Sequence, residues 1–173
     1  DQELDPHNIN RGFWWAHIGW MLYHVPGEKR VRRYTADLRK DPYYRWLDKY
    51  FLLLQIPLGM ILFYLGGWHW VLWGIPLRMV VVYHLTWCIN SVVHTWGTQP
   101  FESNDNSRNN RIMGWLAFGE GWHNNHHAYP TSAKHGLQGQ FDLTWYIIVV
   151  LRALRLATNV RVPKINNTNN EVL

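Results

Sequence analysis

Three histidines lie within five residues of one another, in the stretch GEGWHNNHHAYP at residues 119–130. On an α-helix, His123, His126 and His127 would fall within a sector of roughly 100°, so that their imidazoles could project towards one point. Imidazole binds iron, copper, zinc and nickel alike, so the spacing predicts a metal site and leaves the metal open. A surface patch of histidines that hydrogen-bond locally is the alternative.

Asn90 and His94 form a second polar group that could take part in the same chemistry. They stand four residues apart at the end of a very apolar segment, and such a pair lies on one face of a helix. Polar groups at the depth of a membrane are costly and usually have a functional partner. Side chains that cap or pair helices near an interface are the alternative interpretation.

Other polar residues could support the ligands. Glu120 precedes the cluster and could accept an imidazole N–H, which would fix the nitrogen that faces the metal. An acidic residue at a helix N-terminus is the alternative. His17 and His84 stand among aromatic residues, where each could act on the ligands through hydrogen bonds, whereas His135 is expected to be a solvated loop residue.

Two apolar segments precede the cluster and would have to position it. The first, YFLLLQIPLGMILFYL, covers residues 50–65, and after Gly66 and Gly67 a second run continues to His94. Each is near the roughly 20 residues that cross about 30 Å of hydrocarbon, although the first is short. The pattern predicts a helical hairpin in a membrane, with a hairpin buried in a soluble core as the alternative.

The charge pattern indicates how such a hairpin would be oriented. All lysines and arginines except Arg78 lie outside residues 50–94, and the glycine connection carries none. By the positive-inside rule, both flanks of the hairpin would face the cytoplasm. An aromatic belt at the far interface would be formed by Trp68, Trp70 and Trp73.

Composition excludes several other kinds of site. The chain has 173 residues, enough for one domain, and 47% of them are apolar, yet its mean hydropathy is only -0.28. Its single cysteine, Cys88, excludes an internal disulfide and a cysteine-ligated cluster, so a metal must use histidine. The net charge is +5, but the basic residues lie beside apolar segments without a nucleic-acid-binding signature. Lipid headgroups are therefore expected as partners, and nucleic acid is not.

The end of the sequence predicts two further features. DLTWYIIVVLRALRLA, residues 142–157, alternates apolar and basic residues as a helix at a membrane interface would. The tail NNTNNEVL, residues 166–173, is expected to be disordered.

Three stretches together resemble a known family. DPHNINRGFWWAHIGWML, HLTWCINSVVHTWG and GEGWHNNHHAYPTSAKHG are similar, in order and spacing, to the membrane-bound fatty acyl desaturases of the delta-9 type, and the plant and cyanobacterial branch is the nearer one. The resemblance implies an all-α membrane protein with a cytosolic helical cap. Its parts would be a cytosolic segment (1–48), the second transmembrane hairpin (49–94), the cap with its histidine box (95–160) and a tail (161–173).

The resemblance also implies two iron ions held by a ring of histidines. The matching ligands are His94, His123, His126 and His127, with Asn90 reaching one iron through water. Glu120 and His17 would position the ligands. The expected walls of an acyl tunnel are Trp87, Thr86, Trp14 and Trp15, with aromatic core packing as the alternative.

The implied activity is the oxygen-dependent introduction of a cis double bond, at delta-9, into a saturated acyl chain linked to a lipid or to CoA. Ferredoxin or cytochrome b5 would supply electrons. A histidine-rich membrane hydroxylase and a non-catalytic membrane protein that binds haem or metal are the alternatives. Two earlier histidine boxes of the family are missing, so the chain is expected to be a C-terminal fragment and inactive alone.

The implied location is an integral, multi-pass membrane protein with the histidine site on the cytoplasmic side. For a cyanobacterial protein the membrane would be the thylakoid or plasma membrane, and for a plant protein the endoplasmic reticulum or plastid.

Overall fold

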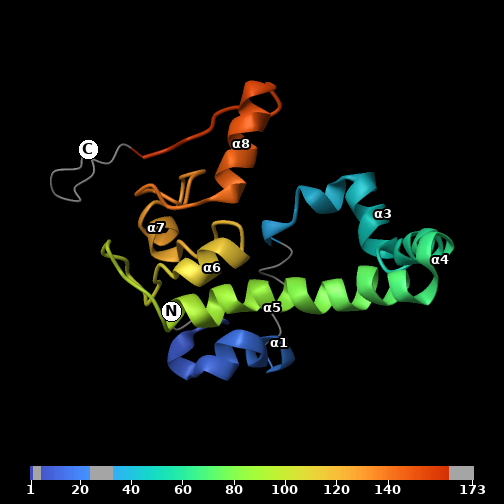
Figure 1. Cartoon of the computed structure of the whole chain (residues 1–173), viewed down its shortest axis with the longest axis horizontal. Coiled ribbons are helices and arrows are strands. Elements are labelled where there is room, and N and C mark those ends of the chain that lie inside the picture. The colour runs from blue at the N-terminus through green and yellow to red at the C-terminus, as the bar shows by residue number, and fades with distance from the viewer. Residues whose placement is uncertain (2–4, 24–32, 164–173) are drawn as a thin grey trace. The chain divides into compact units, whose positions relative to one another are not determined.

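The computed structural model describes residues 1, 5–23 and 33–163, and these residues form helices and loops without a strand (Figure 1). Two isolated antiparallel bridges join Asn109 to Thr98 and to Trp122. The prediction of a helical fold is therefore confirmed. The tail predicted to be disordered lies outside the described residues, as does part of the charged segment before residue 33.

Seven α-helices are bounded in the described chain. They are α1 (Trp20–Tyr23), α3 (Pro42–Tyr50), α4 (Gln55–Leu72), α5 (Arg78–Ser91), α6 (Arg111–Leu116), α7 (His123–Ala128) and α8 (Leu143–Ala153). Shorter or wider turns of helix are η1 (Ile9–Arg11), η2 (Trp15–Gly19), η3 (Leu38–Lys40), η4 (Trp73–Leu77) and η5 (Val92–His94). The chain divides into two compact units, residues 23–83 and residues 1–22 with 84–173.

In the unit of residues 23–83, the chain reverses direction at the two glycines. Gly66 and Gly67 have non-helical backbone angles within α4, and the φ of Gly67, 63°, lies in the region that favours glycine. A Cβ added at Gly59 would lie 3.7 Å from Ile75 Cδ1. A straight helix would hold positions 59 and 75 about 24 Å apart, at 1.5 Å per residue. The two arms therefore fold back on each other at the predicted turn.

The first arm is shorter than the sequence predicted. Residues 51–54 form turns, so the helix begins at Gln55 instead of Tyr50. By length and composition, the continuous helical stretch Gln55–His94 qualifies as one segment able to cross a membrane, with a mean hydropathy of 1.3 and none of its most apolar window buried. Large apolar side chains along both arms are exposed, and Tyr64 reaches 90%.

In the other unit, the N-terminal segment lies along the end of α5 (Figure 1). His17, on η2, is buried and its Nδ1 lies 2.9 Å from Ser91 Oγ. Ala16 and Val93 are fully buried beside these residues in the sequence. The contact fixes the last turn of α5, which leads directly into η5 and His94.

Close backbone contact joins α6 to the loop before α7. A Cβ added at Gly121 would lie 2.0 Å from the backbone nitrogen of Gly114, and one added at Gly114 would lie 2.8 Å from Trp122. No side chain fits between these backbones, since real Cβ atoms do not approach backbone atoms so closely. The glycine of GEGW therefore sets how α7 starts.

Asp142 connects α8 to the loop that follows α7. It is 2% exposed, and its Oδ1 caps α8 by accepting a hydrogen bond from the Trp145 amide at 2.9 Å. Its Oδ2 accepts from the amides of His135 and Gly136 at 2.8 and 2.9 Å. This carboxylate thus places His135 near the histidine cluster.

Candidate metal centre

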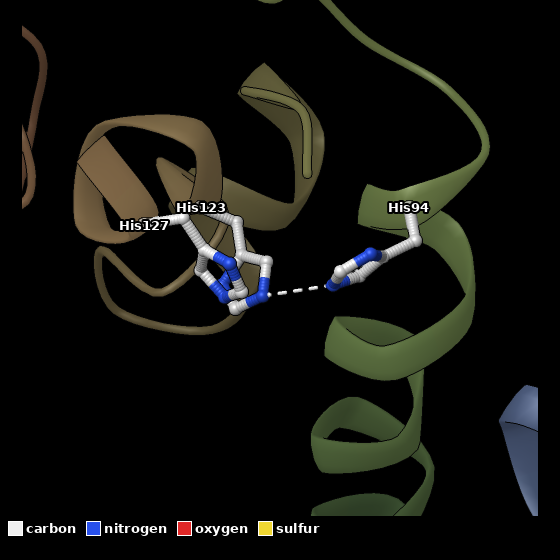
Figure 2. Close-up of side chains that lie close together, drawn as sticks. All are labelled: His94, His123 and His127. Carbon is white, nitrogen blue, oxygen red and sulfur yellow. Dashed lines mark hydrogen bonds between the residues drawn. The ribbon is translucent and has the colours of Figure 1, made fainter. Parts of the chain in front are cut away.

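Three histidines from two elements meet at one point. His123 and His127 lie one turn apart on α7, and His94 ends η5 opposite them (Figure 2). One ligand nitrogen from each of the three lies within 4.8 Å of the other two. His94 Nε2 and His123 Nε2 lie 3.1 Å apart. The prediction that α7 is helical is confirmed, and its i, i+4 spacing brings two imidazoles to the same side.

The spacing of these nitrogens fits a shared ion. Two nitrogens bound at roughly 2.1 Å to one ion, at angles between tetrahedral and octahedral, lie about 3.0–3.4 Å apart. The 3.1 Å between the Nε2 atoms of His94 and His123 falls in that range. His123 Nδ1 is buried and has no hydrogen-bond partner among the described residues. The three residues therefore fit a metal ion, and we call them the histidine triad.

His126 lies beside the triad and not within it. It follows His123 by three residues, and its ring centroid is 5.9 Å from that of His123 but 4.5 Å from that of His135. The expectation that all three histidines of the motif converge on one point is therefore wrong. His126 Nδ1 is also buried without a hydrogen-bond partner in the described chain, which leaves its lone pair or proton unused.

Burial keeps the imidazoles of His123 and His126 neutral. Loss of solvent lowers the pKa of His123 to about 2, and the neighbouring His127, His94 and His126 contribute to the same shift. Burial followed by the influence of His135 and His127 lowers the pKa of His126 to about 4. A neutral imidazole is the form that binds a metal. The site is therefore prepared for a cation at neutral pH.

The two asparagines between the histidines are fully buried. Asn124 hydrogen-bonds to the backbone of Phe101 and donates to Ser103 Oγ at 3.2 Å. Asn125 exchanges hydrogen bonds with Asn109, and its Nδ2 donates to the carbonyl of His135 at 2.7 Å. Each asparagine thus links a loop to α7 through hydrogen bonds.

Two carboxylates contact the outer nitrogens of the triad. Asp105 Oδ2 makes a short contact with His127 Nδ1, and Asp1 Oδ2 lies 3.1 Å from His94 Nδ1. Backbone amides that follow Asp105 in its loop hold both acids. The amide of Ser107 donates to Asp105 Oδ1, and that of Asn106 donates to Asp1 Oδ2. A carboxylate on the far nitrogen of a ligand imidazole is a common arrangement around bound metals.

The other predicted site residues on this side lie outside the triad. Asn90 is half-buried on α5, and its contact with a metal through water stays a prediction. Glu120 is 45% exposed, and its carboxylate lies 3.7 Å from His135 Nδ1. His135 is 16% exposed, so the expectation of a solvated loop residue is wrong: Asp142 and Asn125 hold its backbone against the cluster. Glu120 therefore approaches the cluster through His135.

His17 takes part in a separate pair. Its Nε2 lies 3.0 Å from His84 Nδ1, while its Nδ1 faces Ser91, so both ring nitrogens are engaged away from the triad. The structure does not bring His17 to the nitrogens of His94, His123 or His127. A positioning role for His17 therefore stays a prediction that would have to act through Ser91 and the end of α5.

The four expected tunnel residues lie near this pair or on the surface. The Trp87 ring packs against His17 and His84, with centroids 5.9 and 5.0 Å away. Trp14 is 72% exposed, and Thr86 is exposed on α5. Trp15 donates from Nε1 to the Pro6 carbonyl at 3.0 Å. That these residues wall an acyl tunnel stays a prediction.

Comparison with known families agrees with this geometry. The family model described as fatty acid desaturase matches residues 1–149, which include the triad and both carboxylates. The chain belongs to the fatty acid desaturase family. The resemblance seen in the sequence is thereby confirmed.

Curated desaturases are similar to most of the chain. It is 51% identical to the sn-1 stearoyl-lipid 9-desaturase of Anabaena variabilis over 93% of its residues, and 50% identical to that of Synechocystis over 94%. It is 46% identical to the icosanoyl-CoA 5-desaturase of Limnanthes douglasii over 94%. The matches cover 60%, 52% and 47% of those relatives, so the chain spans about half their length.

Some residues that support the site could not be predicted from the sequence. Asp105, Asp1, Asn124 and Asn125 touch the cluster or hold what touches it, but none stands at a spacing that marks a metal site. The available signal was the loop SNDNSRNN, whose Asn, Asp and Ser residues readily hydrogen-bond to backbone.

Proposed function

We propose that this protein is an oxygen-dependent desaturase that introduces a cis double bond at delta-9 into a saturated acyl chain. The observation that supports the chemistry is the histidine triad, in which one ligand nitrogen from each residue lies within 4.8 Å of the other two. Membership of the family supports the reaction class, and the two lipid 9-desaturases of about 50% identity support the position and a lipid-linked chain. A CoA-linked substrate and another position are the alternatives, because an acyl-CoA 5-desaturase is nearly as similar.

We propose that two iron ions bind in the whole protein. The triad of His94, His123 and His127 would hold one. His126, whose Nδ1 has no hydrogen-bond partner within the described ranges, would contribute to the second, with Asn90 reaching an iron through water. When bound, the irons would supply the oxidising power for removing hydrogen from an unactivated C–H bond. Histidine suits iron but does not by itself select it.

The overall reaction fixes what else must take part. Two hydrogens leave adjacent methylenes, and O2 is reduced to two molecules of water with two further electrons and two protons. An external reductant must therefore deliver the electrons, and we propose ferredoxin or cytochrome b5. The residues of this chain would hold the ions, keep their own imidazoles neutral and exclude water from the buried side of α7.

We further propose that the two arms around Gly66 and Gly67 cross or enter a membrane, which gives access to lipid-linked acyl chains. The exposed apolar side chains along both arms support this, since soluble proteins rarely expose such continuous apolar surface. The second arm, residues 68–94, is about 40 Å long, whereas residues 55–65 reach only about 16 Å. Neighbouring turns or helices would have to complete the first crossing.

Product analysis tests the proposed function. The protein would be expressed at its natural length in a host that lacks delta-9 unsaturated lipids, and its total fatty acids analysed with and without O2. We expect 9-monounsaturated products only with O2. A hydroxylated acyl chain would instead identify the protein as a hydroxylase, and the absence of any O2-dependent product would contradict an enzymatic role.

A further inference from the structure

Asp105 is held in a fixed position beside the triad. Its side chain is 15% exposed, although it lies in a loop. The amide of Ser107 donates to its Oδ1 at 3.0 Å, which leaves Oδ2 directed at His127 Nδ1. The backbone carbonyl of Asp105 accepts from Gln99 Nε2 and Ser103 Oγ at 3.1 and 3.3 Å. The carboxylate and the backbone carbonyl of Asp105 are therefore both held by hydrogen bonds.

The loop is in turn fastened to the helix that carries the ligands. Asn124, fully buried on α7 between His123 and His127, donates to Ser103 Oγ and pairs with the backbone of Phe101. The loop that carries the Asp105 carboxylate is thus hydrogen-bonded to α7, the helix that carries the His127 imidazole. A loop fixed in this way can orient a ligand, whereas a freely moving surface acid cannot.

We propose that Asp105 is a positioning residue of the metal centre, which accepts the Nδ1–H of His127 and so directs Nε2 of that ring towards His94 and His123. The inference rests on the proposed role of His127 as a ligand. In a neutral imidazole one nitrogen carries the proton and the other the lone pair, so a proton held on Nδ1 leaves the lone pair on Nε2. Without the carboxylate, His127 is free to rotate and to exchange tautomers.

The charge of Asp105 adds a second effect. Asp105 accepts from the Ser107 amide on Oδ1 and contacts His127 Nδ1 with Oδ2, so both of its oxygens act as acceptors, as in an ionised carboxylate. An ionised acceptor makes the stronger hydrogen bond and increases the basicity of the imidazole that donates to it. A carboxamide cannot replace it, because Asp105 uses both oxygens as acceptors, Oδ1 for Ser107 and Oδ2 for His127, and a carboxamide has only one.

The test uses the protein at its natural length in detergent, with Co2+ as the probe. We expect Asp105→Ala and the isosteric Asp105→Asn to weaken Co2+ binding by about 10- to 100-fold, the usual effect of removing such a partner. Glu102→Gln is the matched control: Glu102 is an exposed acid of the same loop, so its variant should bind Co2+ as the wild type does.

A second readout separates positioning from a merely structural role. In the metal-free protein labelled with 15N-histidine, the shifts of His127 should show a proton on Nδ1 in the wild type and an exchange of tautomers in Asp105→Asn. Unchanged Co2+ affinity in both variants, an unchanged tautomer, or a doubly protonated His127 in the wild type would overturn the proposal. Full retention of Co2+ by His127→Ala would instead contradict the proposed ligand set, whatever Asp105 does.

Discussion

Asn124 hydrogen-bonds to both backbone groups of Phe101: its Oδ1 accepts from the Phe101 amide at 2.9 Å, and its Nδ2 donates to the Phe101 carbonyl at 3.0 Å. Both residues are buried. The side chain of Asn124 thus supplies the hydrogen-bond partners that the Phe101 amide and carbonyl would otherwise find in backbone groups. This pairing gives the first asparagine of HNNHH a structural role, since its side chain hydrogen-bonds to Phe101 and Ser103.

Asn124→Ala should therefore destabilise the protein strongly. The change removes the partners of two buried backbone groups, which we expect to cost roughly 2–4 kcal/mol. The thermal unfolding midpoint, measured at constant pH and detergent, should fall accordingly, by about 2–4 °C per kcal/mol in a domain of this size. Asn104→Ala, an exposed asparagine of the same loop, should leave the midpoint within error. Equal midpoints for the two variants would contradict this role.

Gly121→Ala should be even less tolerated. The added Cβ would lie 2.0 Å from the Gly114 nitrogen and 2.3 Å from the Met113 carbonyl carbon, and backbone atoms in a packed helix cannot move aside. We expect a loss above about 3 kcal/mol, seen as poor recovery of folded protein. Gly19→Ala is the control, because its nearest atoms lie at an ordinary 3.4 Å. Normal recovery of Gly121→Ala would show that α6 and the GEGW loop separate easily.

The histidines and the hairpin turn could be predicted because their signals are local. The spacing of His123 and His127 on one helix, and the two glycines between apolar runs, determine local geometry whatever surrounds them. The meeting of His94 with α7 could not be derived from spacing alone, since His94 and His123 are 29 positions apart in the sequence. It followed from resemblance to the desaturases.

The supporting contacts were beyond prediction for the same reason. Asp105 reaches His127 only because Asn124 and Ser107 fix the loop, and each of those hydrogen bonds depends on the others. His135 looked like a loop residue, but Asp142 draws its backbone towards His126. The positions of these residues depend on tertiary hydrogen bonds, which produce no periodic pattern in the sequence.

Alanine at His123, His126 or His127 should abolish desaturation by the protein at its natural length. Removing a partner of a ligand typically costs about 10- to 100-fold in affinity or activity, and removing a ligand should cost at least as much. His69→Ala, at an exposed position in the other unit, is the control for loss of an imidazole. Wild-type amounts of unsaturated product from His126→Ala, at equal expression, would remove His126 from the proposed centre.

The flanks of the hairpin should lie on the same side of the membrane. All lysines and arginines except Arg78 lie outside residues 50–94, which favours a cytoplasmic position for both flanks. Single cysteines placed at Arg33 and Lys134, in a background without Cys88, should react with an impermeant reagent from the same side. Labelling from opposite sides would show that the arms do not cross as a pair.

The 173-residue chain itself should bind one Co2+ through the triad, independently of His126. His94, His123 and His127 each offer a nitrogen within 4.8 Å of the others, whereas the His126 ring lies against His135. Affinity for divalent metals follows ligand type and geometry, so the three imidazoles should suffice to capture one ion.

Titration with Co2+, followed by the visible absorption of the bound ion, measures the stoichiometry in the purified chain. We expect one site in the wild type, its loss in His94→Ala and His127→Ala, and its retention in His126→Ala and the control His135→Ala. Equal loss in His126→Ala and His127→Ala, with all variants folded, would mean that the four histidines form one undivided site. Retention in His94→Ala would show that α7 binds the ion without the end of α5, because only His94 brings a nitrogen from outside that helix.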